Sequence, residues 1–147
     1  MTTPSDLYRQ ALEATDTPIL RRTLEPVAAD PARFGRMFYE RLFERAPSVR
    51  DMFPANLASQ ELKLGETLLV LSGHLDDLDG VAPVLRGLGQ RHHRYGATQM
   101  HYDVVGKVLI EVLAEVNGAG FDARARQAWL SLYRWTVQAM GPEVDAA

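Results

Sequence analysis

The chain has 147 residues, enough for one domain with a continuous hydrophobic core. It contains no cysteine, which excludes disulfides, thiolate metal sites and cysteine nucleophiles and leaves four histidines as the main candidates for binding a soft metal. The net charge of −3 is small, so no nucleic-acid partner is expected. No apolar run is long enough to cross a membrane and no secretion signal is visible, which predicts a cytoplasmic protein without a membrane partner.

The first two predicted helices are marked by their start signals. Ser5 can cap a short amphipathic helix, which we interpret as part of an N-terminal extension over residues 1–16. Thr17 followed by Pro18 starts a second helix, which is expected to end near Asp30.

The third predicted helix runs from Pro31 to about Arg45 and carries an aromatic face too broad for a surface helix. It should therefore be a central element. Pro47 closes it, and residues 48–53 are expected to form a short helical turn. The broad face consists of Phe34, Met37, Phe38, Tyr39, Leu42 and Phe43.

The clearest predicted helix covers about residues 57–78, because leucines recur there at intervals of three, four and seven. Gln60 lies one turn before Leu64 and is a polar residue on the apolar face, whereas Lys63 lies to the side.

A histidine completes the apolar face of the next helix, which is expected to open at Pro83 and end near Tyr95. At helical spacing, Leu85, Leu88 and His92 share one face. A buried imidazole needs a partner for each ring nitrogen. Three alternatives therefore remain open: a structural hydrogen bond in the core, a catalytic role, or a metal.

Two more helices complete the chain. Thr98 caps a strongly apolar helix that ends near Asn117, and the last helix covers about residues 122–140. No strand pattern and no internal repeat is present. The sequence therefore predicts an all-α fold, with one domain over 17–141 and a tail over 142–147.

The number of helices and the spacing of several motifs resemble the globin family, most closely bacterial single-domain haemoglobins and the globin domain of flavohaemoglobins. The similarity covers roughly residues 18–140 and implies a globin fold of seven to eight helices around a haem pocket. The motifs that carry it are Phe38-Tyr39-Glu40-Arg41-Leu42-Phe43, Val49-Arg50-Asp51-Met52-Phe53, Gln60 with Lys63 and Leu64, Arg91-His92, Tyr95-Gly96 and His101-Tyr102-Asp103-Val104-Val105-Gly106.

This resemblance implies that haem b is the cofactor and that His92 is its proximal iron ligand. The other imidazole nitrogen should donate to a backbone carbonyl one turn back, near Leu88, which would fix the tautomer. The resemblance also implies that Phe53 packs on the porphyrin and that Tyr39 and Gln60 lie above the iron, together with Leu64. Without haem, each of these distal residues would be an ordinary core residue.

Other residues have roles that the resemblance leaves more open. Lys63 and Arg91 are candidate partners of the haem propionates, with a solvated surface charge as the alternative for each. His93 points away from the apolar face and is the alternative iron ligand. The remaining histidines, His74 and His101, are expected at the surface or at helix ends.

The proximal motif departs from the flavohaemoglobin pattern at one point. Tyr102 matches the tyrosine of that pattern, but Glu143 lies one residue out of register with the expected glutamate, where Val144 stands. A missing carboxylate would weaken the electron push that favours O–O cleavage, which counts against a peroxidase role.

The function implied by the resemblance is reversible O2 binding, with NO and CO as further ligands. Tyr39 and Gln60 would donate hydrogen bonds to bound O2, and nitric oxide dioxygenation would require a separate reductase. No distal histidine is present, so five-coordinate or water-ligated iron is expected, in a monomer or homodimer. The alternatives are a haem-based gas or redox sensor that acts through a protein partner, and a globin-fold interaction protein without haem.

Overall fold

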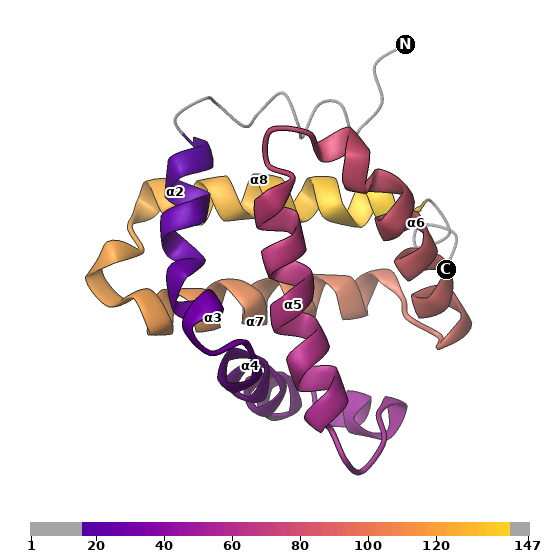
Figure 1. Cartoon of the computed structure of the whole chain (residues 1–147). Coiled ribbons are helices and arrows are strands. Elements are labelled where there is room, and N and C mark those ends of the chain that lie inside the picture. Colours follow the sequence, from indigo (N-terminus) through magenta and orange to yellow (C-terminus); the bar gives the residue numbers. More distant parts are fainter. Residues whose placement is uncertain (1–15, 142–147) are drawn as a thin grey trace.

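The computed structural model describes residues 16–141, which form an all-helical domain without strands (Figure 1). The predicted all-α class is therefore confirmed. In chain order the elements are α2 (Asp16–Thr23), α3 (Glu25–Ala29), α4 (Pro31–Arg45), η1 (Pro47–Met52), α5 (Ala58–Gly73), α6 (Leu78–Arg94), α7 (Gln99–Asn117), η2 (Gly118–Gly120) and α8 (Ala123–Met140).

The helices form two layers that cross each other. In Figure 1, α2 and α5 run across the front of α7 and α8, α6 lies at one side, and α4 is viewed nearly end-on below α3, beside the lower part of α5. The buried core lies between these layers and draws on every long helix. Its most completely buried large side chains are Trp129, Trp135, Phe34, Leu20, Leu85, Leu113 and Leu132.

Glycines permit the closest helix crossings. A Cβ added at Gly35 of α4 would lie 1.9 Å from the Glu61 carbonyl oxygen of α5, so only glycine fits there. A Cβ added at Gly89 of α6 would lie 1.8 Å from the Met140 carbonyl oxygen at the end of α8. These contacts fix α4 against α5 and α6 against α8.

Most predicted helix ends are confirmed by their caps. The Asp30 side chain accepts a hydrogen bond from the Arg33 N–H (3.1 Å) at the start of α4, and Asp122 accepts from the Ala125 N–H (2.9 Å) at the start of α8. Thr98 caps α7 as predicted, in a reciprocal capping box with His101.

Two predicted helix extents are wrong. The helix expected from Thr17 to Asp30 is divided at Leu24, because Pro26 lacks the N–H that would continue the hydrogen-bond ladder. The helix expected over 57–78 ends at Gly73, and Leu78 begins α6 instead. The leucine periodicity continued past the helix end because Leu78 is still buried after the chain has turned.

The start of α6 is also corrected. Pro83 lies inside the helix rather than at its first position, since α6 begins at Leu78. This proline removes one backbone hydrogen bond from the second turn, which packing of the buried Val81 and Leu85 must offset.

The N-terminal extension capped by Ser5, the tail over 142–147 and Glu143 lie outside the described residues. Within residues 16–141, no helix combines the length and apolarity that a membrane span requires.

Candidate functional site

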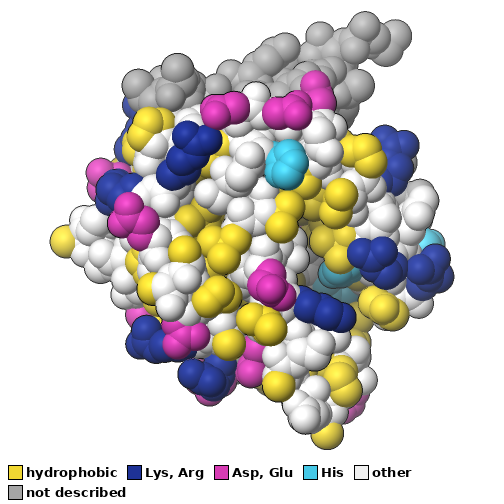
Figure 2. Space-filling model, in the orientation of Figure 1, with side chains coloured by type: hydrophobic (Ala, Val, Ile, Leu, Met, Phe, Trp, Pro, Cys, Tyr) yellow, Lys and Arg dark blue, Asp and Glu magenta, His cyan; other side chains and the backbone are white. Residues whose placement is uncertain are grey.

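A cavity of about 170 Å³ lies between α5, α6, α7 and α8. Its walls are mainly leucine and aromatic side chains, and Figure 2 shows hydrophobic side chains gathered around a hollow on this face, with a histidine inside it. The hydrogen-bonding groups among the lining residues belong to His92, His101, Thr67, Thr136, Tyr102, Tyr133 and Trp129. An apolar cavity with a few polar groups is typical of a cofactor site.

His92 is a half-buried residue in the last turn of α6 and lines this cavity. Its Nδ1 lies 2.8 Å from the Leu88 carbonyl oxygen, where the resemblance expected a hydrogen bond. A carbonyl only accepts, so Nδ1 carries a proton, and in the neutral imidazole this leaves the lone pair on Nε2. The imidazole is thereby held in the tautomer that can bind a metal through Nε2.

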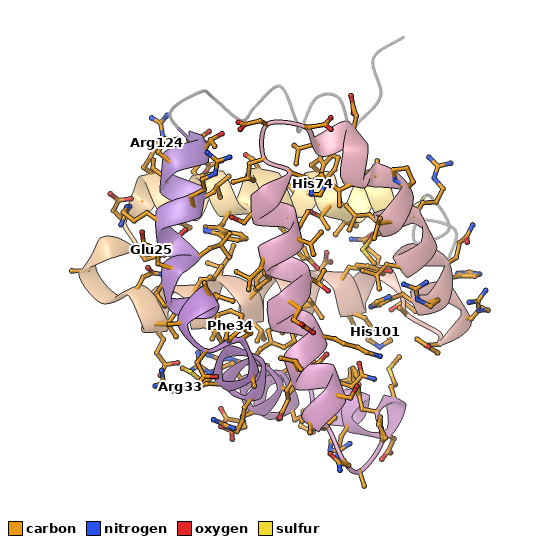
Figure 3. All side chains as sticks on the ribbon, viewed as in Figure 1. Glu25, Arg33, Phe34, His74, His101 and Arg124 are labelled. Carbon is orange, nitrogen blue, oxygen red and sulfur yellow. The ribbon has the colours of Figure 1, made fainter. Side chains whose placement is uncertain are left out.

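The other three histidines lie at helix ends or at the surface. His93 is exposed and does not line the cavity. His74 caps the end of α5, and its Nδ1 lies 3.0 Å from the Val70 carbonyl oxygen. Figure 3 shows His74 near the upper end of α5, well away from His101. His101 accepts a hydrogen bond from the Thr98 N–H through Nδ1 (3.0 Å) and also lines the cavity, which sequence reasoning had not anticipated.

Tyr39 of α4 is only 8% exposed and belongs to a cluster of four aromatic rings. Its ring centroid lies 5.1 Å from Phe38, 5.4 Å from Phe53 and 6.0 Å from Phe43. Burial, together with the charge of Glu61, raises the pKa of Tyr39 to about 12, so the phenol stays protonated and can donate a hydrogen bond at neutral pH. Tyr39 does not itself line the cavity, but its neighbour Phe38 does.

Arg50 holds the loop that carries Phe53. Its guanidinium donates to the carbonyl oxygens of Phe53 (3.3 Å), Pro54 (3.1 Å) and Ala55 (3.2 Å) and lies 5.1 Å from the centre of the Phe43 ring. We had predicted no role for Arg50. The arginine shortly before a proline-containing loop was the available signal, since such a loop leaves several carbonyls without helical partners.

The remaining predicted residues are divided between the cavity wall and the surface. Leu64 and Leu88 line the cavity with His92. Gln60 is half-buried in the first turn of α5, while Lys63 and Arg91 are exposed. Among the described residues, we find no hydrogen bond or ion pair for the side chains of Gln60, Lys63 and Arg91.

Tyr102 is buried at the start of α7, and its ring centroid lies 6.2 Å from that of His92. The Tyr133 hydroxyl of α8 donates to the Tyr102 backbone carbonyl, which ties α8 to α7 beside the cavity. Trp129, another lining residue on α8, donates its indole N–H to the Thr23 hydroxyl (2.8 Å). The proximal wall is therefore fixed by hydrogen bonds as well as by packing.

These groups fit a haem. A single imidazole with an available Nε2 is a common axial ligand of haem iron, and the surrounding leucines suit the apolar face of a porphyrin. The exposed cations Lys63 and Arg91 directly precede the lining residues Leu64 and His92 and suit the carboxylate edge of a porphyrin.

The sequence pattern of the globin family matches residues 36–140, and the chain belongs to the globin family. Neuroglobin-1 of Oncorhynchus mykiss is 30% identical over 145 residues, which cover 89% of this chain and 91% of that protein. The flavohemoprotein of Bacillus subtilis (strain 168) is 29% identical over 101 residues, or 65% of this chain and 25% of that protein.

Solved structures show the same fold. An engineered carbene transferase derived from a candidate nitric oxide dioxygenase of Rhodothermus marinus has a TM-score of 0.80 at 22% identity, covering 92% of this chain and 94% of that chain. A bacterial globin from Campylobacter jejuni has a TM-score of 0.75 at 16% identity, covering 87% and 96%. The predicted globin fold is confirmed, and family membership supports haem-based binding of gas ligands.

Proposed function

We propose that this globin holds haem b through Nε2 of His92 and reversibly binds O2. The observation that carries the proposal is the 2.8 Å hydrogen bond from His92 Nδ1 to the Leu88 carbonyl, because it leaves Nε2 as the coordinating nitrogen in an apolar cavity. When bound, haem supplies an iron centre that takes up small diatomic gases, including NO and CO.

The chain's own residues would bias that site toward O2. Leu64 and its apolar neighbours line the cavity and would exclude water from it. Tyr39 packs against Phe38 of the cavity wall and, with a pKa near 12, keeps its proton as a hydrogen-bond donor toward the gas. Gln60 lies one turn before Leu64 and supplies an amide donor on the same helix. Two donors in an apolar setting favour tight binding and slow release of O2.

Nitric oxide dioxygenation is the further activity that we propose for this site. In that reaction O2, NO and one electron give nitrate. The electron would come from ferrous haem iron, which a separate reductase would then return to the ferrous state. The similarity to a flavohemoprotein supports this assignment. Lys63 and Arg91 would pair with the haem propionates from the rim of the cavity, and Phe53 would pack on the porphyrin.

Hemin titration of the purified protein, followed by absorption spectroscopy, tests the proposal. We expect saturable binding with a Soret band and, after reduction, the spectrum of histidine-ligated ferrous haem. His92→Ala should abolish that ferrous spectrum, whereas the matched variant His93→Ala should keep it. Retention in His92→Ala with loss in His93→Ala would assign the iron to His93, and absence of any Soret band would refute haem binding.

A further inference from the structure

The charges of this protein are unevenly distributed around the candidate site. Residues 80–102 contain no aspartate or glutamate, although the chain has 19 acidic residues in all. The same stretch contains Arg86, Arg91 and Arg94. It covers most of α6, the corner that follows, and the start of α7. In a protein with a net charge of −3, this stretch is locally positive.

The same stretch also holds the most exposed large hydrophobic side chains among residues 16–141. Met100 is 70% exposed, Tyr95 67% and Val84 61%, and the next most exposed such residue, Val70, reaches 47%. Exposed apolar side chains that concentrate in one stretch indicate a contact surface more strongly than scattered ones do.

Arg91 shares one face of α6 with two of these exposed apolar side chains. At 3.6 residues per turn, Val84, Arg91 and Tyr95 fall within about 40° of one another, with Arg94 to one side. The Arg91 guanidinium extends back along the helix, where its Nη1 would lie 3.7 Å from a Cβ added at Gly87. Figure 2 shows Lys and Arg side chains next to hydrophobic ones over α6.

This face is connected to the iron-binding imidazole by one aromatic residue. The Tyr95 ring centroid lies 6.5 Å from that of His92, although Tyr95 is mostly exposed. A molecule that contacts Tyr95 from outside is therefore one side chain away from His92. The corner residue Ala97 also lines the cavity. The exposed face that carries Tyr95 therefore lies close to the cavity that His92 lines.

We propose that this surface, formed by Val84, Arg91, Arg94, Tyr95 and Met100, docks an electron-donating flavoprotein with an acidic face. The inference rests on the proposed haem function. The reduced flavin would lose one electron and ferric haem iron would gain it, with no bond formed or broken in this chain. Charge complementarity would steer the acidic face onto the arginines, and the apolar side chains would pack against it. Two arginines among apolar groups suit a protein partner better than a nucleic-acid backbone, which needs many cations.

Binding can be measured without any electron transfer. An acidic flavodoxin is titrated into isotope-labelled full-length protein, with and without bound haem, and amide shifts are followed by NMR at low salt. We expect saturable shifts concentrated in residues 84–101. Arg94→Glu should weaken binding about fivefold to tenfold. The matched charge reversal Arg33→Glu, on the far side of the molecule in Figure 3, should change it less than about twofold. Met100→Gln should also weaken binding.

Reduction of the haem-loaded protein gives the second measurement. Flavodoxin hydroquinone should reduce the ferric protein about tenfold more slowly in Arg94→Glu than in the wild type or Arg33→Glu, and the difference should vanish at high salt. Equal weakening by Arg94→Glu and Arg33→Glu, or shifts outside the surface, would overturn the proposal. Tighter binding of anionic vesicles or single-stranded DNA to the same residues would overturn it as well. A missing Soret band with intact docking would instead refute only the haem function.

Discussion

The two walls of the candidate haem site are built in different ways. On the proximal side, His92 is oriented by a hydrogen bond to Leu88, four residues earlier in its own helix. On the distal side, Tyr39 is placed by aromatic rings from α4 and from Phe53, which the Arg50 hydrogen bonds hold. The orientation of His92 therefore follows from local helix structure, whereas the placement of Tyr39 depends on tertiary packing.

The glycine crossings give the largest expected difference between the walls. Gly35 of α4 contacts the backbone of Glu61 within α5, so α4 and α5 cannot separate without disturbing the core. Gly89 meets Met140, the last residue of α8, where a helix end can shift. We expect Gly35→Ala to lower the free energy of unfolding by about 3 kcal/mol and Gly89→Ala by about 1–2 kcal/mol, as measured by chemical denaturation.

Gly73→Ala is the matched control for these substitutions. A Cβ at Gly73 would meet no atom within 4 Å, so alanine there should stabilise the protein by about 0.5–1 kcal/mol through its lower unfolded-state entropy. Equal losses in Gly35→Ala and Gly89→Ala would show that the end of α8 is held as firmly as the middle of α5.

Alkaline pH provides a second comparison, because each wall holds a buried tyrosine. Burial raises the pKa of Tyr39 to about 12 and raises that of Tyr133 further. A raised native pKa means that the unfolded protein loses its phenolic proton first. The stabilisation is therefore complete below about pH 10 and is lost as pH rises through 12.

The expected loss of unfolding free energy from Tyr39 alone is roughly 2–3 kcal/mol over this pH range. Tyr39→Phe should flatten the fall measured by denaturation between about pH 9.5 and pH 11.5, where the unfolded phenol titrates first. The control Tyr95→Phe changes a phenol that is 67% exposed and should leave the fall as in the wild type. If the unfolding free energy of Tyr39→Phe fell with pH as steeply as that of the wild type, Tyr39 would not be the cause of the fall.

What could be predicted from the sequence follows the same division between local and tertiary determinants. The starts of α4, α7 and α8 were predicted to within one residue, because each helix is capped by the residue directly before it, Asp30, Thr98 or Asp122. The end of α5 was not, because Leu78 continued the leucine spacing although the chain had already turned. Pro83 was predicted to open α6, because the residues around this proline do not show whether the helix begins there or several residues earlier.

The site repeats this pattern. The Leu88 to His92 hydrogen bond was predictable because both residues belong to one helix turn. The role of Arg50 was not predicted, because the proline-containing loop after it indicates carbonyls without helical partners but does not show which side chain donates to them. The placement of Tyr39 beside the cavity wall rather than in it depends on Phe38, Phe43 and Phe53 together.

Arg50→Met tests whether the distal wall depends on that arginine. Methionine keeps apolar contact with Phe43 but removes the hydrogen bonds to three loop carbonyls. We expect a loss of about 2 kcal/mol in unfolding free energy, together with weaker near-ultraviolet circular dichroism from the aromatic cluster. Arg33→Met, on an exposed arginine of α4, is the control and should stay within about 0.5 kcal/mol of the wild type. Equal effects would mean that the loop is held by packing alone.

Tyr39→Phe in the haem-loaded protein tests whether the distal wall acts on the gas. A lost hydrogen bond of about 1.4 kcal/mol corresponds to a tenfold faster O2 dissociation, which stopped-flow displacement by CO can measure. Tyr133→Phe removes a partly buried hydroxyl from the proximal wall, where it donates to the Tyr102 carbonyl, and should change the rate much less. If both variants released O2 at the same rate, the distal donor role would be wrong. The aromatic cluster around Tyr39 would then be a structural support for Phe53 alone, and Gln60 would be the remaining predicted donor on this wall.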